Sequence, residues 1–171
     1  MVIPESVAMT KIGILSDTHL NDLQKGLTFL DDLFKRHFQD VSLILHAGDV
    51  INPDIFMAFE GIPVYPVRGN MDPYVQGIPQ KRIVTVEGYR IGLIHGWGSP
   101  KGLENRLIQE FDEQGLDAIV YGHSHQPANH FQNGLLFFNP GSATDKRRAE
   151  HCSIGILEIN DGIRGRVINL D

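Results

Sequence analysis

Four short segments of the sequence place metal-binding side chains directly after a run of apolar residues. In chain order, these side chains are Asp17 with His19, then Asp49, then His95, and finally His123 with His125. Each run has the length and composition of a strand buried on both faces, and such strands end at the mouth of a sheet, where α/β folds bind ligands. Because all four predicted strand ends carry Asp or His, we expect these side chains to form one shared site. Mixed carboxylate and imidazole ligands suit Mn, Fe, Zn or Ni.

Each motif also has an ordinary structural interpretation when it is taken alone. Asp17 and His19 lie on one side of an extended segment and can reach one ion, but such pairs are common. A glycine followed by a short polar residue, as at Asn70, most often makes a turn. His123 and His125 are about 6 to 7 Å apart along an extended chain, so each can face a different ion of a pair separated by roughly 3.5 to 4 Å. The functional interpretation depends on the motifs occurring together.

The composition is that of one soluble domain, with 171 residues, 42% of them hydrophobic and 21% charged. We expect residues 1–10 to form a flexible leader and residues 11–171 to form a single domain. The formal charge of −6 argues against extended nucleic acid as a partner. Cys152 is the only cysteine, and no apolar run approaches the roughly 20 residues of a membrane span. The sequence therefore predicts a cytoplasmic protein with a small substrate and no membrane partner, and it leaves open whether the chain forms a homo-oligomer.

The hydrophobic periodicity predicts an α/β first half followed by a strand-rich second half. In the first half we expect strands at residues 11–16, from residue 43 and at 64–67, a helix over 23–38 and a short helix over 53–59. In the second half we expect strands at 82–86, 90–94, 118–121, 135–139, 152–159 and 163–169, and a helix over 102–114 that buries Leu103, Leu107, Ile108 and Phe111. This order predicts an α/β (α+β) fold, a four-layer αββα sandwich of two mixed sheets with helices outside.

The ordered set of motifs resembles the calcineurin-like metallophosphoesterase superfamily, and the small YfcE-type phosphodiesterases most of all. The motifs are D-T-H at 17–19, H-A-G-D at 46–49, G-N-M-D at 69–72, H-G at 95–96, G-H-S-H at 122–125 and N-P-G-S at 139–142. The resemblance implies a centre of two divalent transition-metal ions. Asp17, His19 and His125 would hold one ion, Asn70, His95 and His123 would hold the other, and Asp49 would bridge them. Mn²⁺ is favoured, with Ni²⁺, Fe²⁺ and Zn²⁺ as alternatives.

The resemblance implies a metal-dependent phosphodiesterase in which a hydroxide between the two ions attacks phosphorus in line. Metal coordination lowers the pKa of water from 15.7 to about 7, so this chemistry needs no protein base. Asn70 would act catalytically as well as bind metal, because its carbonyl oxygen can ligate an ion while its amide group faces a phosphate oxygen. The alternative is a non-catalytic protein-binding scaffold of the same fold, like the retromer subunit Vps29. Ligand residues of competent type at all seven positions favour the enzyme.

Two positions depart from the superfamily pattern, and both are expected to lie beside the substrate. Met71 stands where many members have a histidine that protonates the leaving group or stabilises the transition state, and methionine can do neither. Trp97 stands where many close relatives have a second histidine, and it either stacks on a ring of the substrate or packs. Among the other histidines, His46 is expected either to pack within its strand or to support the metal ligands from behind, and His130 to be solvated.

Overall fold

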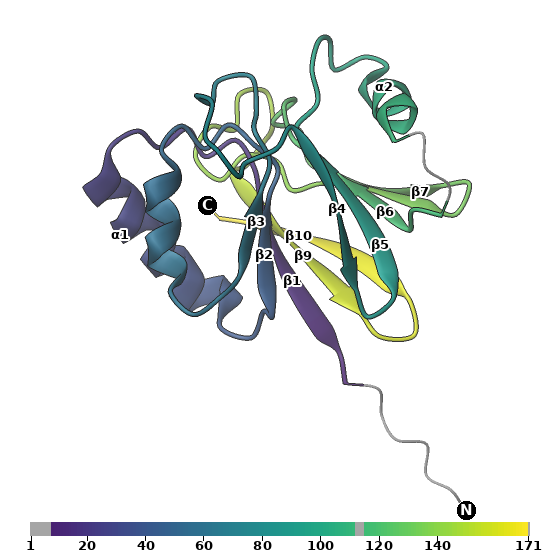
Figure 1. Cartoon of the computed structure of the whole chain (residues 1–171), viewed down its shortest axis with the longest axis horizontal. Helices are drawn as coiled ribbons and strands as arrows, with labels where there is room; N and C mark the ends of the chain where they lie inside the picture. Colours follow the sequence, from purple (N-terminus) through teal and green to yellow (C-terminus); the bar gives the residue numbers. More distant parts are fainter. Residues whose placement is uncertain (1–7, 112–114, 171) are drawn as a thin grey trace, which may run out of the picture.

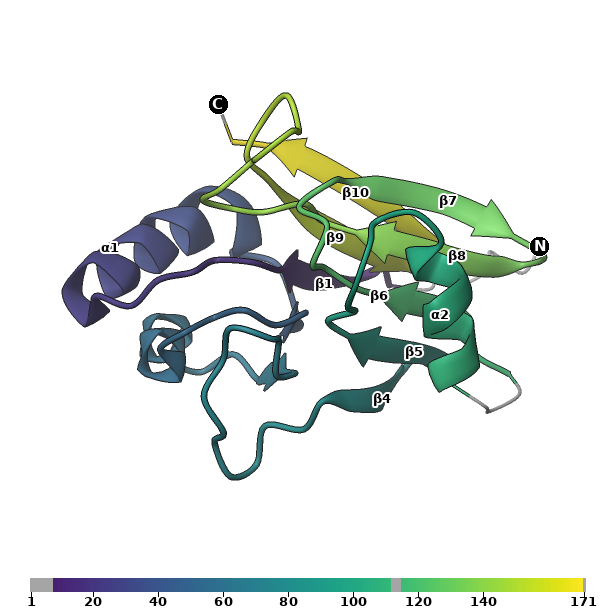
Figure 2. The ribbon, with the colours of Figure 1, turned by 90° about the horizontal axis from the view of Figure 1, so that it is seen from above.

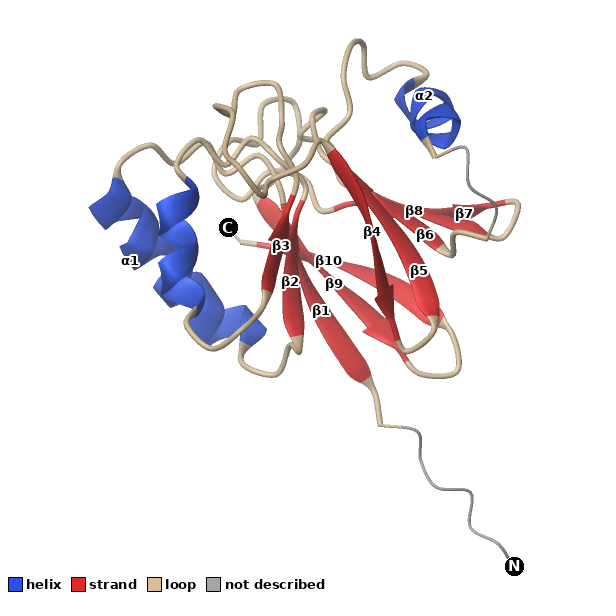
Figure 3. Cartoon of the chain, viewed as in Figure 1, coloured by secondary structure: helices blue, strands red, loops and turns tan. Residues whose placement is uncertain are grey.

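Two five-stranded sheets pack face to face, with helices on both outer sides (Figures 1 and 3). The computed structural model describes residues 8–111 and 115–170. The first sheet has the order β10-β9-β1-β2-β3 and the second the order β4-β5-β6-β8-β7. The strands of the first sheet are β1 (Thr10–Leu15), β2 (Leu43–His46), β3 (Val64–Pro66), β9 (Ser153–Ile159) and β10 (Ile163–Asn169). Those of the second are β4 (Lys81–Val86), β5 (Tyr89–Ile94), β6 (Ala118–Val120), β7 (Ala128–Gln132) and β8 (Leu135–Asn139).

Three clusters of buried apolar residues separate the four layers, which confirms the predicted αββα sandwich. The central cluster lies between the sheets and includes Ile14 and Leu45 of the first sheet and Leu93 and Val120 of the second. A second cluster lies between the first sheet and α1 (Leu23–Leu33), η1 (Phe34–Phe38) and η2 (Pro53–Phe59). A third lies between the second sheet and α2 (Leu103–Glu110). Figure 2 shows α1 and α2 on opposite sides of the molecule.

The predicted helices are present, with corrections at their ends and faces. The helix expected over residues 23–38 is α1 running directly into η1, a π-helical turn, and the Asp22 side chain caps it by accepting a hydrogen bond from Lys25 N at 2.9 Å. Ile108 was expected to face inward but is 40% exposed, because the buried face of α2 repeats every four residues through Leu103 and Leu107. The expected end of this helix, residues 112–114, lies outside the described residues.

The sequence pattern did not predict β7, and the first strand begins one residue earlier than expected. β7 pairs with β8 from Ala128 opposite Asn139, but it is an edge strand with largely exposed side chains, so its sequence carries no clear apolar alternation. Thr10 was assigned to the leader, yet it is the first residue of β1. Residues 1–7 of that expected leader lie outside the described residues.

Parallel pairing brings the ends of several strands to one place. β1, β2 and β3 run parallel to one another in the first sheet, and β5, β6 and β8 do so in the second. The loops that follow these strands gather at one end of the sandwich, at the top of Figure 1. Within the described residues, no helix has the length and apolar character needed to cross a membrane.

Candidate metal centre

The loops at this end of the sandwich bring all seven predicted ligand residues into one cluster. Asp17 and His19 follow β1, Asp49 follows β2, Asn70 follows β3, His95 follows β5, and His123 and His125 follow β6. Asp17, Asp49, His95 and His125 are buried, whereas His19 and His123 are half-buried and Asn70 is exposed. The cluster therefore has a closed inner side and an outer side that a small molecule can reach.

The ligand atoms of the first predicted group, Asp17, His19 and His125, lie within 3.9 Å of one another. His125 Nε2 lies 3.2 Å from Asp17 Oδ1 and 3.3 Å from His19 Nε2. His19 Nε2 is 3.9 Å from the same oxygen of Asp17. These three residues form one of the two sets of acidic and imidazole groups that could hold a metal ion within the described part of the chain.

The second predicted group, Asn70, His95 and His123, meets at the side-chain oxygen of Asn70. Asn70 Oδ1 lies 3.1 Å from His95 Nε2 and 3.2 Å from His123 Nδ1. Asp49 Oδ2 lies 3.3 Å from His95 Nε2 and 3.9 Å from His19 Nε2, so this oxygen stands between the two groups. Asp17 Oδ1 also comes within 3.9 Å of His95 Nε2. The division of ligands between two ions stays a prediction, with Asp49 and Asp17 both within reach of the second group.

The donor atoms fit a bound cation. Asp17 Oδ1 is buried and has no hydrogen-bond partner, although His125 Nε2 approaches it closely. An unpaired carboxylate oxygen in the interior is costly unless it meets a positive charge or coordinates a metal. Without an ion, the imidazole nitrogens that face the carboxylate oxygens either repel them with their lone pairs or must take up a second proton. A divalent ion among these atoms would offset both costs, and the oxygen and nitrogen donors are those that transition metals accept.

Hydrogen bonds on the far side of each imidazole ring fix which nitrogen faces the cluster. His95 Nδ1, His123 Nε2 and His125 Nδ1 each contact a backbone carbonyl oxygen, which can only accept, so these nitrogens carry the proton. The acceptors are the carbonyl groups of Ala47, Gly98 and Asp145, at 2.7, 2.8 and 2.5 Å respectively. The opposite nitrogen of each ring is then free to act as a metal ligand.

The two carboxylates are oriented by hydrogen bonds to their outer oxygens. Asp17 Oδ2 accepts hydrogen bonds from Ser16 Oγ at 2.6 Å and from His123 N at 3.0 Å. Asp49 Oδ1 accepts one from Met71 N at 2.8 Å. Burial acts to raise the pKa of Asp17, but the neighbouring histidines and the Ser16 hydroxyl outweigh it and hold the pKa below its usual value. Asp17 is therefore ionised, as a metal ligand must be.

Asp72 ties two of the site loops together, a role that the sequence reasoning did not assign. Its carboxylate accepts hydrogen bonds from the backbone N–H groups of Asp49, Ile51 and Gly69, at 2.8, 2.7 and 2.7 Å. These bonds join the loop after β2 to the loop after β3 and so fix Asp49 relative to Asn70. The available signal was the acidic residue that completes the G-N-M-D motif.

The backbone at the site is strained, and close approaches depend on two glycines. Five predicted ligands have a left-handed conformation, with φ of 52° at Asp17, 47° at His19, 57° at Asp49, 68° at His123 and 58° at His125. Such conformations are unfavourable for non-glycine residues and cluster at functional sites. A Cβ atom at Gly69 would collide with Asp49, and one at Gly122 would collide with Ser16 and Asp17. These glycines allow the loops to close around the carboxylates.

His46 is buried beside the site and packs as predicted. Its Nδ1 accepts a hydrogen bond from Gly48 N at 3.2 Å, its Nε2 lies 3.1 Å from Thr18 Oγ1, and its ring meets Phe56 edge-on at 5.3 Å. Burial lowers the pKa of His46 from 6.5 to about 4, against the opposing charge of nearby carboxylates such as Asp72. His46 is therefore neutral in the folded protein at physiological pH.

Stability should fall on acidification through His46. Because the unfolded chain takes up a proton near pH 6.5 and the folded chain does so only near pH 4, this stabilisation is complete above pH 6.5 and is lost as the pH falls towards 4. The difference corresponds to about 3 kcal/mol. His46→Gln should lose less unfolding free energy over this interval than the wild type, measured by urea denaturation of the metal-free proteins at several pH values. Identical pH dependence in both proteins would contradict this assignment.

Met71 and Trp97 lie at the outer rim of the cluster. The Met71 side chain is 58% exposed, while its backbone N–H is bonded to Asp49. The Trp97 side chain is 42% exposed and so does not pack into the core. A cavity of about 360 Å³ is lined by Trp97, Asn70 and His95, together with Arg68 and Lys81. Both residues are therefore exposed, and Trp97 shares a cavity with Asn70 and His95, whereas a contact of either residue with a substrate stays a prediction.

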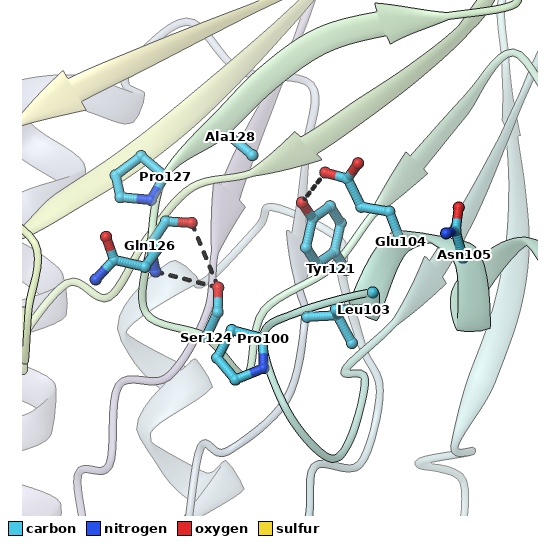
Figure 4. A pocket seen from close by; sticks show the side chains of 10 residues that line it. Pro100, Leu103, Glu104, Asn105, Tyr121, Ser124, Gln126, Pro127 and Ala128 are labelled. Carbon is cyan, nitrogen blue, oxygen red and sulfur yellow. Dashed lines mark hydrogen bonds between the residues drawn. The ribbon is translucent and has the colours of Figure 1, made fainter.

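A second cavity, of about 380 Å³, is lined by Pro100, Gly102 and Ser124 and extends along the start of α2 (Figure 4). Tyr121 donates a hydrogen bond of 2.5 Å to Glu104 within it. Burial and the neighbouring Glu104 carboxylate raise the pKa of Tyr121. His130 is exposed as predicted, but it also contacts Glu104 at 2.9 Å. No sequence motif marked Glu104 or Tyr121.

Comparison with known proteins gives consistent matches across the chain. The sequence model of the calcineurin-like phosphoesterase superfamily domain matches residues 10–162. A curated relative from Methanothermobacter thermautotrophicus, described as a probable metallophosphoesterase, is 40% identical over 152 residues, which are 87% of this chain and 86% of that protein.

Solved structures share the fold. A predicted phosphoesterase from Streptococcus pneumoniae has a TM-score of 0.76 and 24% identity, and the match covers 95% of this chain and 90% of that one. Vacuolar Protein Sorting 29 from Cryptosporidium parvum has a TM-score of 0.72 and 21% identity, covering 95% and 92%. A protein described as a novel archaeal phosphodiesterase has a TM-score of 0.68 and 22% identity, covering 93% and 100%. At these identities the likeness establishes the fold alone.

Proposed function

The chain belongs to the calcineurin-like phosphoesterase superfamily, and on that basis we propose that it is a dinuclear metal-dependent phosphodiesterase that hydrolyses a small phosphodiester. Membership implies divalent metal ions as cofactors. The observation that carries the proposal is the convergence of seven ligand-competent residues from five loops on one cluster, with Asp49 Oδ2 between two groups of ligand atoms.

Divalent ions held by these residues would supply a nucleophile at neutral pH and would polarise the phosphoryl oxygen. The protein's own contribution is to hold the ligand atoms in place. The carbonyl hydrogen bonds of the imidazoles and the hydrogen bonds to Asp17 and Asp49 leave the metal-facing atoms free without further rearrangement. Asn70 is exposed and turns its carbonyl oxygen towards His95 and His123. Its amide group is then available to donate a hydrogen bond to a phosphate oxygen.

The cavity beside the cluster supports a small substrate. Its volume of about 360 Å³ is at the lower end of the range for small-molecule sites. Arg68, Lys81 and Glu110 line it, so the lining carries a small net positive charge beside the metal ligands in a chain whose net charge is −6. A phosphate ester is negatively charged, so this local charge attracts it although the chain as a whole is acidic. We infer Mn²⁺ as the preferred ion because oxygen ligands are mixed with imidazole.

The alternative is a protein-binding scaffold without catalytic activity. The fold does not distinguish the two functions, since the chain superposes on Vacuolar Protein Sorting 29 with a TM-score of 0.72. A scaffold has no need for seven competent ligand residues or for the unpaired, buried Asp17 Oδ1 that they surround. The complete ligand set therefore favours the enzyme.

The test is a substrate panel with controlled metal content. The protein is stripped with a chelator and reconstituted separately with Mn²⁺, Ni²⁺, Fe²⁺, Zn²⁺ and Mg²⁺. Each form is then assayed on matched phosphomonoesters and phosphodiesters. We expect no activity in the stripped protein, the highest activity with Mn²⁺, and diesters hydrolysed faster than monoesters. Absence of hydrolysis with every metal would favour the scaffold, and a preference for monoesters would refute the phosphodiesterase assignment.

A further inference from the structure

We propose that the cavity beside Trp97 binds a planar aromatic group of the substrate, so that the preferred substrates are phosphodiesters in which one ester group carries a nucleobase. This inference rests on the proposed phosphodiesterase function and names its substrate class. The cavity is continuous with the metal centre, because Asn70 and His95 line both. A phosphate held at the metal centre would therefore extend one of its ester groups past Trp97.

Trp97 is exposed, yet the chain around it is held firmly. The Arg106 guanidinium donates hydrogen bonds to the backbone carbonyl groups of residues 97, 99 and 101, with distances of 2.8 Å to Trp97 O and 3.1 Å to Lys101 O. The carbonyl group of Gly98 accepts a hydrogen bond from His123 Nε2 at 2.8 Å, which joins this segment to the metal centre. The indole is thus attached to a fixed backbone, so its position varies only through rotation of its own side chain, while the residue stays 42% exposed. A ring on a fixed backbone loses less conformational freedom when a ligand stacks on it than a ring on a mobile loop would lose.

The other walls of the cavity suit a polar aromatic ring rather than a lipid. Arg68 and Lys81 line the cavity with positive charge, and Gln80 and Glu110 add groups that can donate and accept hydrogen bonds. Lys81 Nζ is 3.4 Å from the Glu110 carboxylate, so these two side chains meet at the wall. A nucleobase offers both a face for stacking and an edge with donors and acceptors, whereas an alkyl chain offers neither.

The experiment uses Trp97 as its own reporter, because it is the only tryptophan in the sequence. Adenosine 5′-monophosphate, phenyl phosphate and ribose 5-phosphate are titrated separately into the protein, with and without Zn²⁺, an ion that is not paramagnetic. Fluorescence is excited at about 295 nm, and affinities are measured by calorimetry. Adenosine 5′-monophosphate and ribose 5-phosphate share the phosphate and sugar, so the difference in affinity between them isolates the base. We expect saturable quenching by the nucleotide and about tenfold tighter binding than ribose 5-phosphate.

Three variants test whether the preference for the nucleotide depends on Trp97. Trp97→Ala should reduce the affinity for adenosine 5′-monophosphate to that of ribose 5-phosphate, whereas Trp97→Phe should keep most of the preference because a face for stacking remains. Asn105→Ala, in the second cavity of Figure 4, is the matched control and should bind like the wild type. Melting temperatures verify that each variant is folded.

The outcomes separate this inference from the proposed function. Equal affinity for the nucleotide and ribose 5-phosphate, or an unchanged preference in Trp97→Ala, would overturn the aromatic site even if the enzyme hydrolyses diesters. If phenyl phosphate binds as tightly as the nucleotide, the preference for a nucleobase is refuted and the site accepts aromatic rings in general. A nucleotide preference that depends on Trp97, in a protein that hydrolyses nothing, would support the binding site and refute the phosphodiesterase.

Discussion

Asp49→Ala is expected to reduce phosphodiester hydrolysis by roughly a thousandfold or more. Asp49 Oδ2 is the carboxylate oxygen that stands between the two ligand groups, at 3.3 Å from His95 Nε2 and 3.9 Å from His19 Nε2. Removing it takes one negative ligand from both proposed ions at once. The same substitution leaves the Met71 backbone N–H without its acceptor, so the loop after β3 should also lose a constraint. The measurement is kcat/KM on an aryl phosphodiester in the presence of Mn²⁺.

Two further variants separate the loss of the Asp49 charge from any loss of folded structure. Asp49→Asn keeps an oxygen that can accept the Met71 hydrogen bond but lacks the negative charge, so it should fold normally and still lose most activity. Asp161→Ala changes an exposed aspartate between β9 and β10 and should retain wild-type activity. Equal losses in Asp49→Ala and Asp161→Ala would refute the assignment, as would activity within tenfold of the wild type in Asp49→Ala.

The second large effect concerns the leaving group. Position 71 is where many superfamily members have a histidine that protonates the departing oxygen, and Met71 cannot donate a proton. The absence of a general acid there should cost roughly 10²- to 10⁴-fold for poor leaving groups and little for good ones. We therefore expect activated aryl diesters such as bis-p-nitrophenyl phosphate to react much faster than alkyl phosphomonoesters. The rate should depend steeply on the pKa of the leaving group.

Met71→His tests this prediction without disturbing the metal centre. The Met71 side chain is 58% exposed and only its backbone N–H is bonded to Asp49, so an imidazole can replace it while that hydrogen bond stays. Rates for a series of diesters with graded leaving groups should give a shallower slope in Met71→His than in the wild type. Met71→Leu is the matched control and should keep the steep slope. An unchanged slope in Met71→His, or a wild-type preference for alkyl monoesters, would contradict the role given to this position.

The parts of the site that the sequence predicted follow from strand burial. Runs such as the one before Asp49 are apolar apart from His46 because their strands are covered on both faces, so their ends are visible in the sequence. Parallel pairing then carries those ends to one place, which requires no knowledge of individual side-chain contacts. The ligand residue types and the sandwich of two sheets were predictable for this reason.

Other features depend on contacts between distant segments, which the sequence does not display. Two sets of hydrogen bonds form only after the chain folds. One joins Asp72 to the loop after β2, and the other joins the Arg106 guanidinium to the backbone at Trp97. The left-handed backbone at Asp17 has no local signal, since aspartate does not require it. β7 was missed because an exposed edge strand needs no apolar alternation.

The proposed dinuclear site requires that each chain bind two metal ions between the loops of its two sheets. Elemental analysis of the chelator-stripped protein, after reloading with Mn²⁺ and removal of excess metal, measures this directly. We expect two Mn²⁺ ions per chain in the wild type and a clear loss of metal in Asp49→Ala, while Asp161→Ala should bind two. A wild-type protein that retains no more than one ion per chain would contradict the dinuclear site.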